Sequence, residues 1–203
     1  MTPSRRIRFK FDLDKFVHLV TYLAEKVRDF DRLKATKMLY FIDKHHLIRY
    51  GRPILGDVYY RLDYGPVPSL AFDLLKEADD NLPVSLDSLP GKKYLLEYVE
   101  IDTRPQYPVF RPKKQADLEF FSEEEMASIN AIIQRLGQLT SVQLMDKSHL
   151  DATHQRTAQR SQIDYRLFFE GEPEALHDAY EVMELEQEDR EFAEGLADDR
   201  NPF

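Results

Sequence analysis

Residues 32–54 read RLKATKMLYFIDKHHLIRYGRPI, and this stretch decides the fold class. The run MLYFI at residues 38–42 places apolar side chains on every face of a helix, and a helix of that kind is buried. We therefore expect a helix over residues 31–50 in the middle of the core. Gly51 follows where a helix end favours a left-handed residue, and Pro53 prevents the helix from resuming.

Segments further along the chain predict amphipathic helices, each with one buried stripe. Apolar residues recur with i, i+3, i+4, i+7 spacing over residues 12–27. Two S/T-x-x-E/Q capping boxes open later helices, which we expect over residues 123–136 and 141–149.

The segment that follows the central helix is extended and rich in tyrosine. Residues 56–69 read GDVYYRLDYGPVPS, and both prolines lack an amide donor and keep the preceding residues out of the helical region. Ser69 can then cap a short helix that runs through about Ala78, with Leu70 among its inward residues.

A strand pair supplies the expected β component. Residues 92–101 (KKYLLEYVEI) and 107–111 (YPVFR) read as two strands around a possible TRPQ turn, and the prolines of the second confine it to an edge. The predicted fold class is mostly α (α+β): a compact helical domain with a small antiparallel hairpin or sheet and an acidic C-terminal helix.

Charge divides the chain into three parts. From Glu170 to the end, 13 acidic and 2 basic residues give −11, so a chain of net charge −9 leaves +2 for residues 1–169. The first ten residues carry four cations and no acid. We expect a basic arm over residues 1–11, a domain over 12–169 and an acidic extension over 170–203, helical from about Pro173. The extension either attracts basic partner surfaces or only solubilises the chain.

Composition and motifs argue against several classes of function. The chain has no cysteine, no signal-peptide pattern and no apolar run long enough to cross a membrane, so we expect a cytoplasmic protein. Nucleic-acid binding is not expected, because the cations of residues 31–50, such as Lys37 and Lys44, read as an ordinary solvated face. We also expect no enzyme activity and no cofactor, since no nucleophile elbow or phosphate-binding loop occurs.

One group of side chains has metal-ligand character. Asp146, His149, Asp151 and His154 are the best such set in the chain, but they lack a fixed ligand geometry. Capping and local hydrogen bonding are therefore the preferred interpretation, with no metal. A small metal-dependent hydrolase built around His149 and His154 stays as an alternative.

Several short motifs occur together in a specific order. The central helix ends in D-K-x-H, residues 51–57 read GRPILGD, and residues 64–69 read YGPVPS. This order and spacing resemble the signature of the Panacea domain of SocA-like antitoxins, and residues 121–149 resemble its second half. Many members carry a tryptophan after the later S-H pair, and this chain has none. The structural positions of the motif are Asp43, Lys44, Gly51, Pro53, Gly56, Asp57 and Gly65.

The resemblance implies an antitoxin of a bacterial or phage toxin–antitoxin pair that neutralises a cognate protein toxin by direct binding. A second possibility is an adaptor that delivers the toxin to an ATP-dependent protease.

Tyrosines are enriched at interface hot spots, so the candidate partner-binding residues are Tyr59, Tyr60, Tyr64 and Pro66. The alternative is that these tyrosines are buried and support the turn.

Overall fold

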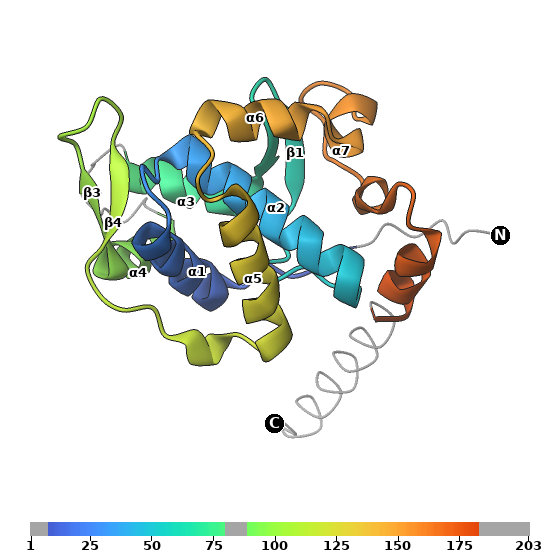
Figure 1. Ribbon diagram of the computed structural model, residues 1–203, viewed down its shortest axis with the longest axis horizontal. Helices are drawn as coiled ribbons and strands as arrows, with labels where there is room; N and C mark the ends of the chain where they lie inside the picture. Colours follow the sequence, from blue (N-terminus) through green and yellow to red (C-terminus); the bar gives the residue numbers. More distant parts are fainter. Residues whose placement is uncertain (1–7, 80–88, 183–203) are drawn as a thin grey trace, which may run out of the picture.

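Helix α2, Arg32–Tyr50, runs through the centre of the molecule, with the other helices around it (Figure 1). The structure is a computed structural model, and it describes residues 8–79 and 89–182. Residues 38–42 are all buried, which confirms that α2 forms the middle of the core. Gly51 ends the helix with a φ of 74°, in the left-handed region that favours glycine.

Three further helices begin at side-chain caps. Asp12 accepts from the amide of Lys15 at the start of the first, and both predicted capping boxes are present at the other two. Helices α5 and α6 pack against α2. These helices, which confirm the predicted spans, are α1 (Leu13–Lys26), α5 (Glu123–Leu136) and α6 (Ser141–His149).

The tyrosine-rich segment folds into an antiparallel hairpin of β1 (Tyr59–Leu62) and β2 (Gly65–Pro68). Both prolines of the segment lie in β2, where a missing amide donor is tolerated because the sheet has only two strands. The other edge of β1 is bonded to a later segment, since the amide of Ile163 donates to the carbonyl of Tyr59 at 2.8 Å. The hairpin is therefore held on both sides of β1.

The short helix after the hairpin is α3 (Ser69–Asp79). Its buried leucines are Leu74 and Leu75, but Leu70 is 45 % exposed, so the prediction that Leu70 faces inward was wrong. Leu70 lies in the first turn, where it lines a surface pocket with Phe11 and Tyr60 instead of entering the core.

The predicted strand over residues 92–101 is mostly a helix, α4 (Pro90–Tyr98), and only β3 (Val99–Asp102) is a strand. Lys92 and Leu95 are buried one helical turn apart in α4, and the buried Val99 begins β3. A run this short and rich in aromatic and aliphatic residues shows strand composition, which is why the prediction failed. β3 pairs antiparallel with β4 (Val109–Pro112), so the second strand is confirmed as an edge.

The C-terminal part of the described chain wraps back onto the body. Ala179 and Tyr180, on a helical stretch over residues 173–182, are buried in the same core cluster as α2. The first part of the acidic extension therefore packs on the domain, and residues 183–203 lie outside the described residues, as do residues 1–7 of the basic arm. The remaining short elements are η1 (Leu118–Phe120), α7 (Ala152–Arg156) and η2 (Tyr165–Phe169).

The predicted fold class is confirmed: the described part of the chain is mostly helical and has two small antiparallel sheets. Among the helices of the described ranges, none combines the length and the apolar character that a membrane span requires.

We expect Leu39→Ala to lower the free energy of unfolding by about 2–5 kcal/mol, because it leaves a cavity inside the core. Leu39 is 0 % exposed, whereas Leu150 is 77 % exposed, so Leu150→Ala is the matched control and should change it by less than about 0.5 kcal/mol. Urea unfolding of both variants measures the difference, and equal losses would mean that α2 is not the centre of the core.

Candidate functional site

The carboxylate of Asp43 connects α2 to the turn and hairpin that follow it. Its Oδ1 accepts from the amides of Ile54 and Leu55 at 2.9 and 2.8 Å. Its Oδ2 accepts from the hydroxyl of Tyr59 at 2.9 Å, and Asp43 is 0 % exposed. One buried side chain therefore sets the path of the chain from the end of α2 to β1.

Burial raises the pKa of Asp43 from 3.8 to about 7, because a charged carboxylate loses its hydration there. The three donors act in the opposite direction, since hydrogen bonds to the charged form favour ionisation. Desolvation is the larger of the two effects.

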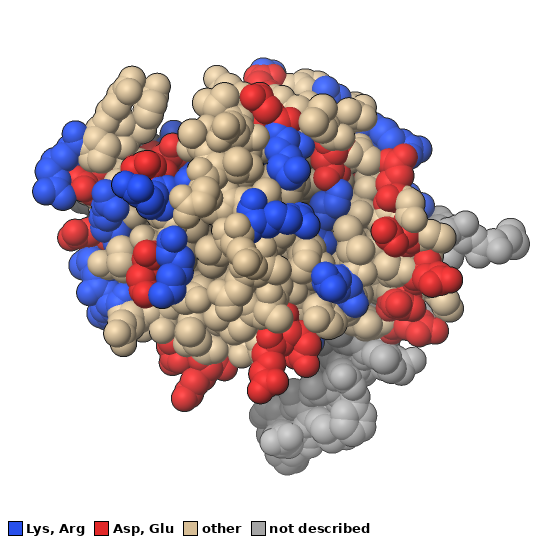
Figure 2. Space-filling view, in the orientation of Figure 1, with Lys and Arg blue, Asp and Glu red and all other residues tan. Residues whose placement is uncertain are grey.

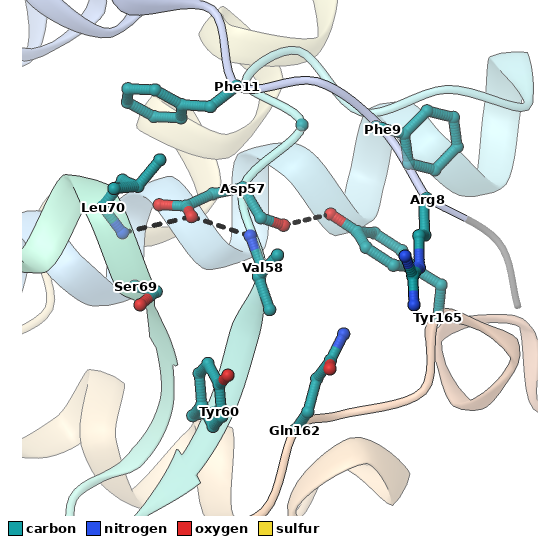
Figure 3. Close-up of a pocket in the computed structure, with 11 residues that line it drawn as sticks. Arg8, Phe9, Phe11, Asp57, Val58, Tyr60, Ser69, Leu70, Gln162 and Tyr165 are labelled. Atoms are coloured by element: carbon teal, nitrogen blue, oxygen red, sulfur yellow. Dashed lines mark hydrogen bonds between the residues drawn. The ribbon is translucent and has the colours of Figure 1, made fainter.

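Asp57 performs a similar function for α3 (Figure 3). Its carboxylate accepts from the amides of Val58 at 2.7 Å, Leu70 at 3.2 Å and Ala71 at 2.8 Å. The cap of α3 is therefore Asp57, and the prediction that Ser69 caps this helix was wrong. Burial raises the pKa of Asp57, and its carbonyl accepts from the hydroxyl of Tyr165 at 2.5 Å.

The tyrosines of the hairpin have different positions. Tyr59 is 1 % exposed, and its ring packs against Tyr40 and Phe168 at centroid distances of 5.7 and 5.6 Å. It therefore supports the turn from inside, as the alternative interpretation has it, and contributes no accessible surface. Tyr60 and Tyr64 are 36 % and 66 % exposed, and Pro66 is buried.

Lys37 bonds the hairpin to α2 on the buried side of the hairpin. It is 0 % exposed, and its Nζ donates to the carbonyl of Pro66 at 2.8 Å. Burial lowers the pKa of Lys37 to about 7, because a charged ammonium loses its hydration there. The expectation that Lys37 lies on a solvated face was therefore wrong.

The tip of the hairpin comes very close to α6. Gly65 has a φ of 93°, and a Cβ atom added there would lie 2.4 Å from Ser148 Oγ and 3.0 Å from Lys37 Nζ. Only glycine fits this conformation and this contact. The adjacent Tyr64 is then held at the surface beside the end of α6.

Three of the four predicted ligand-like side chains make contacts of other kinds, and Asp146 is exposed on α6. Asp151 accepts from the Lys44 ammonium and caps α7 through the amide of Thr153 at 3.1 Å. His149 and His154 stack on each other with ring centroids 4.4 Å apart. Within residues 8–79 and 89–182, no three His, Cys, Asp or Glu side chains come together as metal ligands.

The surface charge is not uniform in spite of the net charge of −9. Figure 2 shows Lys and Arg side chains grouped at the end formed by α4, β3 and β4, and Asp and Glu side chains along the opposite end, over residues 173–182. Electrostatic attraction of a partner therefore depends on which end of the molecule it approaches.

Sequence reasoning did not find the roles of Lys37 and Tyr165. Lys37 stands one helical turn before Phe41, and this spacing within the apolar run was the available signal. Tyr165 carried no such signal, because its bond joins it to a residue far back in the chain.

The family model described as Antitoxin SocA-like, Panacea domain, matches residues 36–153, which is more than half of the chain. The chain therefore belongs to the Panacea domain family of SocA-like antitoxins. No curated protein and no solved structure matches it.

We expect Gly65→Ala to destabilise the protein by more than Gly171→Ala. Gly171 has a φ of 88° and nothing within 4 Å of an added Cβ, so its variant reports only the cost of the backbone conformation, about 1–2 kcal/mol. Gly65→Ala adds the overlap with Ser148, about 1–3 kcal/mol more. Adding Ser148→Ala should recover part of this extra loss in urea unfolding; additive losses would show that the contact is not tight.

We expect the stability of the wild type to fall relative to Asp43→Asn as the pH rises from about 4 to about 7. The pKa of Asp43 is raised from 3.8 in the unfolded chain to about 7 in the folded state. The stability that the protonated carboxyl contributes is therefore complete below pH 3.8 and is lost as the pH rises through about 7. Urea titrations across this range measure the difference. Parallel curves would mean that the three donors fully offset the effect of burial.

Proposed function

We propose that this protein is an antitoxin that acts in the cytoplasm and neutralises a cognate protein toxin by binding it directly. Membership of the Panacea family over residues 36–153 is the observation that carries this proposal. Members of the family are described as SocA-like antitoxins, and an antitoxin of this kind needs a stable surface rather than a catalytic centre.

The use of the polar side chains supports a binding function. Asp43, Asp57 and Lys37 lie in the family motif or beside it, and their hydrogen bonds hold the hairpin and α3 in place. Lys44 pairs with Asp151 and so joins α2 to the cap of α7. A reacting group would need access to substrate, whereas Asp43 and Lys37 are 0 % exposed.

The outer side of the hairpin is the proposed interface. Tyr60 and Tyr64 present large amphipathic rings there, while Tyr59 and Pro66 shape it from beneath. Rings of this type bury much area and lose little conformational entropy on binding, which makes them frequent hot spots.

Co-expression with the protein encoded by the adjacent gene tests the proposal. Such pairs are usually encoded together, so we expect that protein to stop growth alone and to be neutralised and co-purified with this chain. Occlusion predicts that the toxin stays abundant while inactive, whereas delivery to an ATP-dependent protease predicts that it disappears. A neighbour that neither inhibits growth nor binds argues against the antitoxin role.

We expect Tyr64→Ala to weaken toxin binding by about tenfold or more, because it removes an exposed ring from a rigid tip. Tyr107→Ala is the matched control, since Tyr107 is 65 % exposed on the β3–β4 connection and Tyr64 is 66 % exposed. Calorimetric titration with the purified toxin measures both affinities, and thermal melts confirm that both variants fold. Equal affinities would place the interface away from the hairpin tip.

A further inference from the structure

A pocket opens between the N-terminal segment and the start of the hairpin (Figure 3). Its volume is about 390 Å³, at the lower end of the range for small-ligand and anchor pockets. Phe9 and Phe11 line it on the N-terminal side, and Tyr60, Leu70 and Tyr165 line it from β1, α3 and η2.

The walls of this pocket are held in place before any partner binds. The amide of Asp12 donates to the carbonyl of Leu55 at 2.9 Å, which fixes the N-terminal segment along the turn. The carbonyl oxygen of Lys10 lies 2.4 Å from where a Cβ of Gly56 would be, so the N-terminal segment and the turn before β1 are in direct contact. Phe9 packs edge-to-face on Tyr165 at 5.2 Å. A preformed wall reduces the ordering cost of binding.

Apolar side chains gather at the mouth of the pocket. Val58, Tyr60 and Leu70 are 37 %, 36 % and 45 % exposed, although all three are large and apolar. They come from the segment before β1, from β1 and from α3, and they line the same opening. A concentration of exposed apolar surface around a concave site is typical of a docking position for another molecule.

The accessible charge of the pocket is positive. Among the described residues that line it, Asp57 is the one acid, and that carboxylate is 1 % exposed and already accepts three amide bonds. Arg8 is exposed at the rim and forms no ion pair within the described ranges of the chain. Lys10, two residues further on, is a second exposed cation. Charge complementarity therefore favours an acidic occupant.

We propose that this pocket anchors a segment of the toxin that carries a large apolar side chain with carboxylates beside it. The apolar side chain fills the space between Phe11, Leu70 and Tyr60, and the carboxylates face Arg8. This inference rests on the proposed antitoxin function and adds the chemistry of the partner's contact. It also separates two parts of the interface, the pocket and the hairpin tip.

Binding of the adjacent-gene toxin to two full-length variants tests the assignment. Leu70→Gln removes the apolar contact, and Arg8→Glu reverses the charge at the rim. Each should weaken binding by about tenfold, and the Arg8→Glu loss should shrink between about 0.05 and 0.5 M salt, because screening weakens exposed charge pairs. The matched controls are Leu118→Gln and Lys93→Glu, which change exposed residues of η1 and α4, away from the pocket and the hairpin tip, and should bind as the wild type does.

The outcomes separate this inference from the proposed function. If the wild type binds the toxin and both pocket variants bind equally well, the pocket assignment is overturned and the antitoxin role stands. If the wild type does not bind the toxin, the proposed function fails first.

Panning random displayed peptides against the full chain is an independent readout. We expect enriched peptides with an aromatic or large aliphatic residue next to Asp or Glu, and weaker capture by Leu70→Gln. Enrichment of basic peptides, or equal capture by that variant, overturns the proposal.

Discussion

A carboxylate inside a helical core is stable only if its oxygen atoms find donors, and Asp43 finds them in the backbone of Ile54 and Leu55 and the hydroxyl of Tyr59. These bonds force the chain to turn immediately after α2 and to begin β1 beneath the aromatic cluster. The position of the hairpin, the cap of α3 and the pocket beside the N-terminal segment all follow from this turn.

Two other buried polar side chains hold the backbone in the same way. Asp57 takes the first amides of α3, and Lys37 takes the carbonyl of Pro66, so each end of the hairpin is held by a buried polar side chain. Burial shifts the pKa of Asp43 upward and that of Lys37 downward, in both cases toward the neutral form. The inner side of the hairpin is therefore devoted to shape, and only its outer side is available to a partner.

This division suits the proposed function of recognising a partner protein. A rigid hairpin and a preformed pocket lose little freedom on binding, so a few exposed rings can supply most of the affinity. Charge adds selectivity: the rim of the pocket is basic, and the surface over residues 173–182 is acidic. A partner with its own uneven charge would be oriented as it approaches.

Local sequence patterns were sufficient for α2, for both capping boxes and for the family motif, because helix periodicity and capping depend on residues a few positions apart. They failed for α4, whose short apolar run fits a strand equally well, and for Leu70, whose exposure depends on what packs beside it. The burial of Tyr59 and Lys37, and the pocket between Phe9 and Tyr165, were decided by tertiary structure alone. Each depends on contacts between segments far apart in the chain, and no local pattern encodes which segments will meet.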